Sequence, residues 1–241
     1  MMQNVGIIED NTKLFVCDIQ EKFRPAIQYF GDVIEVTKRL IQDMIRRSVG
    51  YLAPRTSTVF ICDIQEKFRN NIQYFADIVS VSKRLIQASQ VLDVDLVITE
   101  QYPQGLGHIV PELSSLLNNQ KIYNKTQFSM CLPEVCADNP SLKSVIICGI
   151  EAHACVLQTA MDFIEKEVEV HVVVDAVSSR SMLDRKYALT RMRQMGCFLT
   201  TSECVLLQLC RGSHHPKFKD IQKIILKSAP TSGLLNWSSE S

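Results

Sequence analysis

Residues 144–159 read SVIICGIEAHACVLQT, and this stretch decides the fold of the chain. The β-branched apolar run over residues 144–148 predicts a buried strand that ends at Gly149, and the apolar spacing over residues 155–166 predicts a helix. Cys155 then lies in the first turn of that helix, where exposed backbone N–H groups and the helix dipole favour a thiolate. The stretch indicates a strand, a turn and a helix that carry a candidate nucleophile.

Outward from this stretch, buried strands and helices alternate along the chain. Apolar and β-branched runs predict strands over residues 59–63, 95–100, 121–126, 168–175 and 198–200. Amphipathic spacing predicts helices over residues 72–87, 184–195, 204–210 and 216–227. This alternation predicts an α/β fold of three layers, in which a doubly wound parallel sheet has helices on both faces.

Composition limits the partners and the compartment. The chain has 241 residues, 46% of them hydrophobic, and 26 basic residues balance 26 acidic ones, so we expect a globular protein that attracts neither nucleic acid nor an anionic membrane. None of the apolar runs has the length of a membrane span. Nine cysteines, an odd number without a Cys-x-x-Cys pair, indicate a reducing compartment, and the first twelve residues lack Lys and Arg, so we expect a cytoplasmic protein.

One segment of the chain occurs twice. Residues 14–42 read LFVCDIQEKFRPAIQYFGDVIEVTKRLIQ and residues 59–87 read VFICDIQEKFRNNIQYFADIVSVSKRLIQ; 9 mismatches in 29 positions leave 20 identities. Each copy predicts a buried strand, a loop and an amphipathic helix. A central position in a parallel sheet holds one strand, so the two copies compete for the same place.

The second copy is the better candidate for the sheet. Its helix has Ala76 where the first copy has Gly31, a difference of about 1 kcal/mol in helix propensity. It also leads directly into the strand at 95–100, whereas a linker rich in Gly, Pro and Ser/Thr follows the first copy. The first copy would be a surface helix, an added edge strand, an element swapped between subunits or a disordered extension. We therefore expect a surplus extension over residues 1–57, one α/β domain over 58–227 and a flexible tail over 228–241.

Three polar residues lie where predicted strands end. Asp63 follows the first strand of the domain, Lys125 lies in the third and Cys155 begins the helix after the fourth. The carboxyl ends of parallel strands converge on one crevice, so these side chains should meet. A carboxylate that accepts the thiol proton and an ammonium that favours the anion would make the cysteine a nucleophile, with backbone N–H groups stabilising an oxyanion.

These residues belong to motifs of a known family. The motifs are CDIQEKF (62–68), TEQYPQGLG (99–107), KTQFSM (125–130), GIEAHACV (149–156) and VVVDAVSSRS (172–181). With them the chain resembles the isochorismatase-like cysteine hydrolases, most closely those of animals, from about residue 58 to about residue 235. The resemblance implies a sheet of about six parallel strands and an Asp-Lys-Cys triad carried by Asp63, Lys125 and Cys155.

The resemblance also implies a cis peptide bond at Ile150-Glu151, with the N–H groups of Glu151 and Cys155 as the oxyanion hole. The candidate pocket residues are Gln101, Tyr102, Phe128 and His153. The family's nicotinamidases hold a metal with an Asp-x-His pattern after the second strand, and residues 101–108 lack that pattern, so we expect neither a metal nor a cofactor. The isochorismatases proper lack the nucleophilic cysteine that this chain retains.

The sequence therefore favours a metal-independent hydrolase that cleaves a C–N bond in a small amide-like molecule through a thioester, and oligomerisation of identical subunits is expected from the family. The alternative is a catalytically silent protein that uses this fold for protein interaction. At residue level, Cys155 could be a small buried hydrophobe, Asp63 could accept loop N–H bonds and Lys125 could be solvated. Arg180 could bind an anionic substrate group or lie on the surface.

Overall fold

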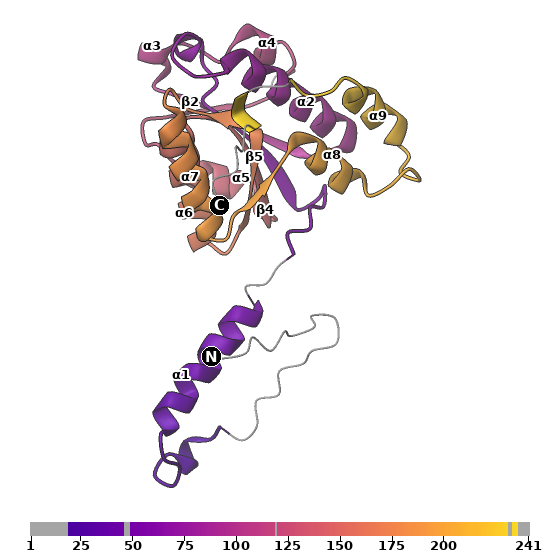
Figure 1. The fold of residues 1–241 in the computed structure, drawn as a ribbon. Coiled ribbons are helices and arrows are strands. Elements are labelled where there is room, and N and C mark those ends of the chain that lie inside the picture. Colours follow the sequence, from indigo (N-terminus) through magenta and orange to yellow (C-terminus); the bar gives the residue numbers. More distant parts are fainter. Residues whose placement is uncertain (1–18, 46–48, 119, 231–232, 236–241) are drawn as a thin grey trace. The chain divides into compact units, whose positions relative to one another are not determined.

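The computed structural model describes residues 19–45, 49–118, 120–230 and 233–235. Its contacts divide the chain into two units, Met1–Val49 and Gly50–Ser241. The second unit contains a sheet of six strands, all parallel, in the order β3-β2-β1-β4-β5-β6 (Figure 1). The strands are β1 (Ser57–Cys62), β2 (Asp95–Gln101), β3 (Ile122–Lys125), β4 (Ser144–Ile150), β5 (Glu169–Ser178) and β6 (Phe198–Thr200). The predicted α/β class and its parallel sheet are confirmed.

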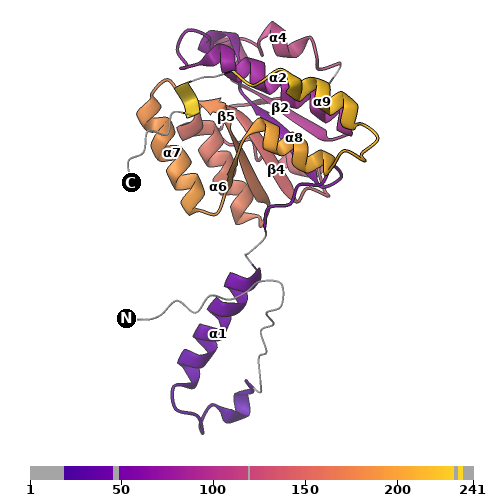
Figure 2. The same ribbon diagram turned by 45° about the vertical axis from the view of Figure 1, so that its right-hand side comes forward.

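Helices cover both faces of this sheet, as Figure 1 shows. One layer consists of α2 (Phe75–Leu92), α8 (Ser202–Cys210) and α9 (Phe218–Leu226), which lie side by side (Figure 2), and the other contains α5 (Pro133–Asp138), α6 (Leu157–Glu165) and α7 (Met182–Gln194). Short helices α3 (Pro103–Leu106) and α4 (Pro111–Ser114) follow β2. The fold is therefore a doubly wound sandwich of three layers.

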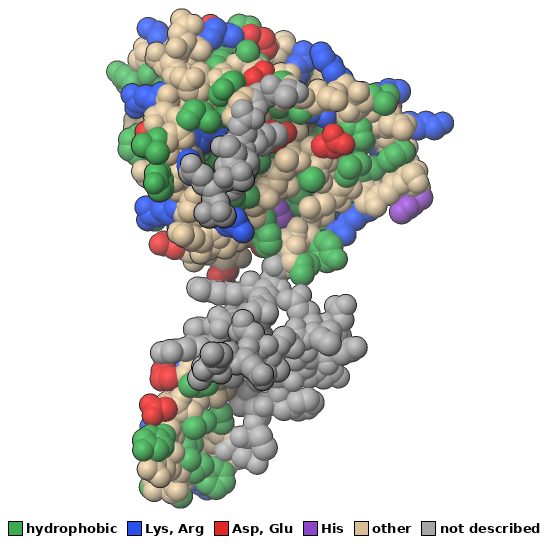
Figure 3. Space-filling view, in the orientation of Figure 1, with side chains coloured by type: hydrophobic (Ala, Val, Ile, Leu, Met, Phe, Trp, Pro, Cys, Tyr) green, Lys and Arg blue, Asp and Glu red, His purple; other side chains and the backbone are tan. Residues whose placement is uncertain are grey.

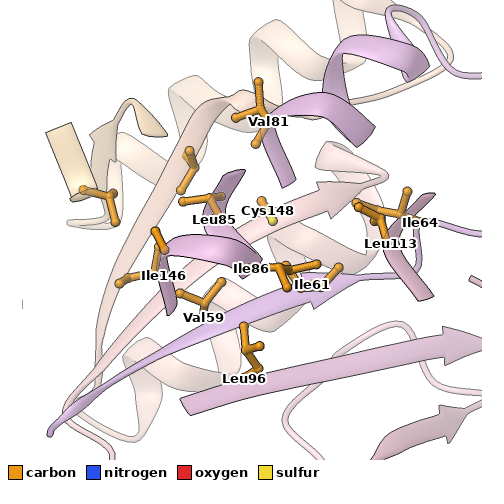
Figure 4. Packing of buried hydrophobic residues seen from close by; sticks show 14 of the residues in the cluster. Val59, Ile61, Ile64, Val81, Leu85, Ile86, Leu96, Leu113, Ile146 and Cys148 are labelled. Carbon is orange, nitrogen blue, oxygen red and sulfur yellow. The ribbon is translucent and has the colours of Figure 1, made fainter. Parts of the chain in front are cut away.

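Alternation along the strands divides the core into two. From β1, Val59 and Ile61 pack with α2, α8 and α9, whereas Phe60 and Cys62 face α5, α6 and α7. All six residues of β1 are buried, as expected for a central strand covered on both faces. Figure 4 shows the first of these cores, where Leu85 and Ile86 of α2 pack against the strand residues Val59, Ile61, Leu96 and Ile146.

The second copy of the repeated segment forms β1 and α2, as the sequence favoured. In the first unit, the first copy contributes a short 3-10 turn at Glu21–Phe23 and the helix α1 (Phe30–Ile45), while its predicted strand lies outside the described residues. Val33 and Val36 of α1 are 43% and 54% exposed, whereas their counterparts Ile78 and Val81 are 0% and 1% exposed. These two apolar positions are thus exposed in the first copy and buried in the second, whereas Phe30 and its counterpart Phe75 are buried in both.

Two expected segments differ in detail from the structure. The helix expected from residue 155 begins instead with a π-helical turn over Ala152–Val156, which continues into α6. Within the expected tail, Gly233–Leu235 forms a 3-10 turn in which Leu234 is buried and its carbonyl accepts a hydrogen bond of 3.0 Å from Nη1 of Arg185. This described part of the tail is therefore packed on the domain.

Candidate active site

The three candidate catalytic side chains lie together at the carboxyl edge of the sheet. Asp63 directly follows β1, Lys125 is the last residue of β3, and Cys155 lies in the π-helical turn after β4. Strands β1 and β4 are neighbours, and β2 separates β1 from β3. The long lysine side chain spans that distance, so residues 62 positions apart in sequence make a direct contact.

Asp63 and Lys125 form a buried ion pair. Nζ of Lys125 lies 2.7 Å from Oδ2 of Asp63, and neither side chain is more than 1% exposed. The other oxygen of Asp63 accepts a 2.8 Å hydrogen bond from the hydroxyl of Thr99 on β2. Charges that are removed from water need a partner and further hydrogen bonds. Both conditions are met, so the pair is fixed in one arrangement.

Three more oxygens surround the ammonium of Lys125. It donates to Oε1 of Gln101 and to the carbonyl of Phe128, both at 2.7 Å, and to the carbonyl of Gln127 at 3.3 Å. Burial by itself would lower the pKa of Lys125, but its electrostatic interactions with the neighbouring acidic groups, Asp63 among them, outweigh burial and raise that pKa. Lys125 is therefore a permanent cation at the site.

Cys155 lies beside this pair and beneath the surface. Its sulfur, the sulfur of Cys62 and a carboxylate oxygen of Asp63 all lie within 4.8 Å of one another. The residue is 7% exposed, and its carbonyl accepts a 2.6 Å hydrogen bond from the hydroxyl of Thr159 one turn later. The thiol thus has both a carboxylate and an ammonium in its immediate surroundings.

Gly149 allows β4 to approach β1 closely just before the turn. Its φ is +119°, and a Cβ atom at this position would lie 2.1 Å from the carbonyl oxygen of Cys62. Only glycine combines this φ with that closeness. The peptide bond between Ile150 and Glu151, immediately afterwards, is cis as the resemblance implied. This local path of the chain sets the position of the turn that carries Cys155.

A cavity of about 370 Å³ opens above Cys155. Its lining is mostly apolar and aromatic, and consists of Asp63, Phe68, Gln101, Tyr102, Leu106, Phe128, Ile150, Glu151, Ala154, Cys155 and Arg180. Of the four predicted pocket residues, Gln101, Tyr102 and Phe128 are in this lining. His153 is not: its Nδ1 lies 3.0 Å from the hydroxyl of Ser179 instead.

Arg180 and Glu151 form the charged part of the lining. Nη2 of Arg180 lies 3.3 Å from Oε1 of Glu151, and the backbone N–H of Arg180 donates to Oε2 of Glu151 at 3.0 Å. The arginine side chain is 70% exposed and the glutamate side chain 11% exposed. The guanidinium end of this pair is open to solvent, so Arg180 is accessible to a ligand anion at the rim of the cavity.

Gln65 is a positioning residue that the sequence did not reveal. It is fully buried, and its side chain accepts from the N–H of Gln101 at 2.7 Å and donates to the carbonyls of Gln101 and Gly107 at 3.0 and 2.5 Å. Since Gln101, the last residue of β2, in turn accepts from Lys125, Gln65 holds the end of the strand that orients the ammonium. The only hint in the sequence is its place two residues after Asp63.

Among the described residues, Cys62, Asp63 and Cys155 form a group that offers three possible metal ligands. Two sulfurs and a carboxylate are donors that Zn²⁺ accepts. The Lys125 ammonium, however, already lies 2.7 Å from the Asp63 carboxylate. A bound metal would have to displace this internal cation, so the donor set does not fit a resident ion.

The fold and the site define a doubly wound α/β protein whose candidate nucleophile lies at the carboxyl edge of a parallel sheet. The sequence profile of the family described as "Isochorismatase domain" matches residues 57–204. The chain belongs to this family of isochorismatase-like hydrolases. In keeping with this, it is 53% identical over 231 residues to isochorismatase domain-containing protein 2 of Xenopus laevis, covering 95% of this chain and 90% of that protein.

Solved structures give the same result. The structure described as MAR1 ribonuclease from Caenorhabditis elegans has 51% sequence identity and a TM-score of 0.76, and the match covers 79% of this chain and 100% of that one. The YcaC gene product of Escherichia coli, described as an octameric hydrolase of unknown specificity, has 21% identity and a TM-score of 0.68, with 74% and 92% coverage. At that identity the likeness shows the fold alone.

Proposed function

We propose that the protein is a metal-independent cysteine hydrolase that cleaves a C–N bond in a small amide-like substrate, with Cys155 as nucleophile, Asp63 as proton acceptor and Lys125 as fixed cation. The observation that carries the proposal is the position of Cys155, which lines the cavity and lies within 4.8 Å of the Asp63 carboxylate. A thiol with an adjacent base and cation is the arrangement that nucleophilic catalysis requires.

The reaction would proceed in two halves. Asp63 accepts the thiol proton, the sulfur of Cys155 attacks the substrate carbonyl carbon, and the N–H groups of Glu151 and Cys155 stabilise the oxyanion. The C–N bond breaks when Asp63 returns the proton to the leaving nitrogen, which leaves a thioester. Asp63 then takes a proton from water, the hydroxide attacks the thioester carbonyl, and the acid is released as the thiol is restored.

The cavity limits the size and character of the substrate. A volume of about 370 Å³ suits a small molecule, and Phe68, Tyr102 and Phe128 offer apolar and aromatic contact. Arg180 could bind an anionic group at the rim, because its present partner Glu151 holds it only through an exposed contact. Substrates with a compact apolar body and an amide close to one end would fit this lining.

The test must distinguish the proposed hydrolase from two alternatives. The name of the C. elegans relative raises RNA as a substrate, but the chain has 26 basic and 26 acidic residues, and on the face in Figure 3 the Lys and Arg side chains of residues 50–241 are scattered rather than gathered in a stripe. RNA-binding proteins are normally basic along the path of the phosphates. The second alternative is a silent fold that serves protein interaction.

The test combines turnover with trapping of the intermediate. Incubation with a panel of small primary amides and with a metabolite extract should give an acyl adduct on Cys155 that intact-mass analysis detects. Cys155→Ala should reduce turnover by about a thousandfold or more, and Asp63→Asn should also abolish it. Cys197→Ser and Asp18→Asn are the matched controls and should leave turnover unchanged.

The outcomes separate the alternatives. Undiminished turnover by Cys155→Ala would reject the mechanism. Cleavage of RNA that depends on Cys155 would replace the substrate class. Alkylation of Cys155 by iodoacetamide with the pH profile of an ordinary thiol, together with no adduct from any substrate, would favour the interaction protein.

Two broader properties belong to the same proposal. None of the helices in the described ranges is long and apolar enough to cross a membrane. The eight cysteines that the structure describes are free, which is compatible with a reducing, cytoplasmic location. We further propose a homo-oligomer, which light scattering coupled to size exclusion would measure; a mass of one chain would reject it.

A further inference from the structure

A second thiol, which the proposed reaction does not use, lies next to Cys155. Cys62 is the last residue of β1 and is fully buried, whereas Cys155 lines the cavity. The two sulfurs lie within 4.8 Å of each other. The sulfur of Cys62 also lies 3.6 Å from Oδ2 of Asp63, so the two thiols and the carboxylate are in contact range of one another.

From this juxtaposition we propose that Cys62 is a resolving thiol: a peroxide that enters the cavity oxidises Cys155, and Cys62 then closes a Cys62–Cys155 disulfide that reversibly blocks the site. The inference rests on the proposed function in one respect, the reactivity of the Cys155 thiolate. It does not depend on the identity of the substrate.

Both steps balance. The Cys155 thiolate attacks one oxygen of hydrogen peroxide, the O–O bond breaks, and the products are a sulfenic acid and hydroxide. The sulfur of Cys62 then attacks the sulfur of the sulfenic acid, the S–O bond breaks, and the hydroxyl leaves as water with the Cys62 proton, which Asp63 can relay. In sum, two thiols and one peroxide give one disulfide and two waters. A small dithiol reverses the bond by exchange.

The surroundings of the two thiols set the order of these steps. Cys155 lines the cavity, so an oxidant that enters the cavity reaches its sulfur, whereas Cys62 is fully buried. Burial, the contact with Cys155 and the charge of Asp63 raise the pKa of the Cys62 thiol well above its usual value, although Lys125 partly opposes them. Cys62 therefore stays protonated and inaccessible until its neighbour has been oxidised.

A disulfide needs the sulfurs to move from within 4.8 Å to about 2 Å. Rotation of the two side chains can supply much of this movement, because Cys155 lies in a turn rather than in a strand. The bond would remove both the nucleophile and the thiol that contacts Asp63. It would also prevent further oxidation of Cys155 to the sulfinic acid, which thiols do not reverse.

The chain contains an internal comparison. The sulfurs of Cys131 and Cys136 lie 3.6 Å apart, and both residues are partly buried. Burial and the contact with Cys136 raise the pKa of Cys131 to about 12, so the Cys131 thiol stays protonated at neutral pH. If proximity alone governed oxidation, the pair at 131 and 136 would also form a disulfide.

The experiment maps disulfides in the full-length protein after treatment with hydrogen peroxide and blocking with N-ethylmaleimide. Cleavage after Lys, Arg and Glu separates the relevant cysteines, since Cys62 falls in residues 56–66, Cys148 in 144–151 and Cys155 in 152–165, while Cys17 falls in 14–21. We expect a crosslink between 56–66 and 152–165 that dithiothreitol removes.

Variants test the role of each thiol. In Cys62→Ala, Cys155 should accumulate as sulfinic and sulfonic acid, and the fraction of Cys155 that dithiothreitol restores should fall about tenfold. Cys148→Ala, a buried cysteine of β4, should oxidise as the unaltered protein does. An unchanged restored fraction in Cys62→Ala, or a predominant crosslink between Cys131 and Cys136, would overturn the inference.

The experiment distinguishes failure of this inference from failure of the proposed function. If iodoacetamide alkylates Cys155 rapidly near neutral pH but peroxide gives no Cys62–Cys155 crosslink, the resolving role of Cys62 is wrong and the nucleophile stands. If Cys155 reacts with neither reagent, the reactive thiol itself is wrong, and both proposals fall together.

Discussion

Lys125 has four oxygen acceptors for its three ammonium protons. The acceptors are a carboxylate oxygen, an amide oxygen and two backbone carbonyls, and three of the four distances are 2.7 Å. Such a cation is immobile, so it acts on its surroundings through its charge and not by moving. An arginine in its place would need to fit a larger, planar group into the same buried space.

His171 makes stability depend on pH through burial. It lies in β5, is 2% exposed and stacks on Phe198 with ring centroids 4.8 Å apart. Burial lowers the pKa of His171 below its usual value, although Glu169 partly opposes this. The unfolded chain therefore binds the proton more readily than the folded chain. Above about pH 6.5 His171 is neutral in both states and does not lower the unfolding free energy. As the pH falls from there toward the pKa of the folded state, the unfolding free energy decreases.

We predict that His171→Phe reduces the loss of unfolding free energy between pH 7.5 and pH 5, as measured by urea denaturation at both values. The phenyl ring preserves the stacking on Phe198 and has no proton to gain. His214→Ala, at an exposed histidine, should leave the acid-induced loss unchanged. Equal losses in His171→Phe and the unaltered protein would contradict the assignment.

The sequence alone predicts the three central site residues because each one follows or ends a strand. Parallel strands end at one edge, so Asp63, Lys125 and Cys155 had to converge there. Thr99 and Gln65 escaped prediction because neither is a charged or nucleophilic side chain that marks a site. Thr99 donates to Asp63 from within β2, and Gln65 donates to the carbonyls of Gln101 and Gly107. No local pattern encodes such pairings.

The lining of the cavity differs from the predicted pocket residues because of the local path of the backbone. His153 was expected in the pocket, but the π-helical turn directs its ring toward Ser179. A π turn contains an extra residue, which changes the direction of the side chains within it. Phe68, Leu106 and Arg180 join the lining from a 3-10 turn, from the end of α3 and from the segment after β5, whose paths depend on the packing of the whole domain.

At the scale of elements, the close approach of β1 and β4 positions the turn that carries Cys155. Substitution of Gly149 by alanine would place a Cβ atom 2.1 Å from the Cys62 carbonyl oxygen, at a φ of +119°. The two strands would have to separate where Asp63 and the π turn begin. We predict that Gly149→Ala lowers the unfolding free energy by about 3 kcal/mol or more.

The control is Gly196→Ala, because Gly196 has a φ of +96° but no atom within 4 Å of an added Cβ. It should therefore cost only the backbone strain, about 1–2 kcal/mol. Urea denaturation of both variants gives the two losses of unfolding free energy, and their difference is the cost of the steric contact between β1 and β4. Equal losses would show that the closeness of β1 and β4 has no energetic weight.

The elements themselves were well predicted where apolar periodicity is strong. The sheet was predicted because buried strands and amphipathic helices alternate, and β1 and α2 were assigned to the second copy from one Gly-to-Ala difference and a short connection. The π turn could not be foreseen, since apolar spacing does not distinguish an α-helical first turn from a π-helical one. The sequence left several alternatives open for the first copy, because the apolar positions exposed at Val33 and Val36 of α1 are buried at Ile78 and Val81 of α2.

At the scale of the whole molecule, we propose that the boundary of the independent domain falls at residue 50 rather than at 57 or 58. Leu52 is fully buried in the core beside α2, and the carbonyl of Thr56 accepts from the N–H groups of Lys143 and Ser144 at 2.9 and 3.0 Å. The segment before β1 therefore contributes packing and hydrogen bonds to the sheet domain.

We predict that a chain of residues 50–241 unfolds at the same urea concentration as the full chain. A chain of residues 57–241 should lose about 3 kcal/mol, because it lacks the Leu52 side chain and the Thr56 carbonyl. If both truncated chains matched the full chain, residues 50–56 would be dispensable. If both were equally destabilised, the first unit would contribute to the stability of the second.

Because the second copy and not the first forms β1 and α2, the repeat has a consequence for folding during synthesis. A ribosome releases residues 14–42 before residues 59–87, so the nascent chain first exposes a sequence that matches the central element of its own sheet at 20 of 29 positions. The earlier copy is then a competitor for the later one until β2, joined to the second copy by a short connection, pairs with it. Dilution from urea should accordingly give native protein more slowly from the full chain than from residues 50–241, even where the two are equally stable.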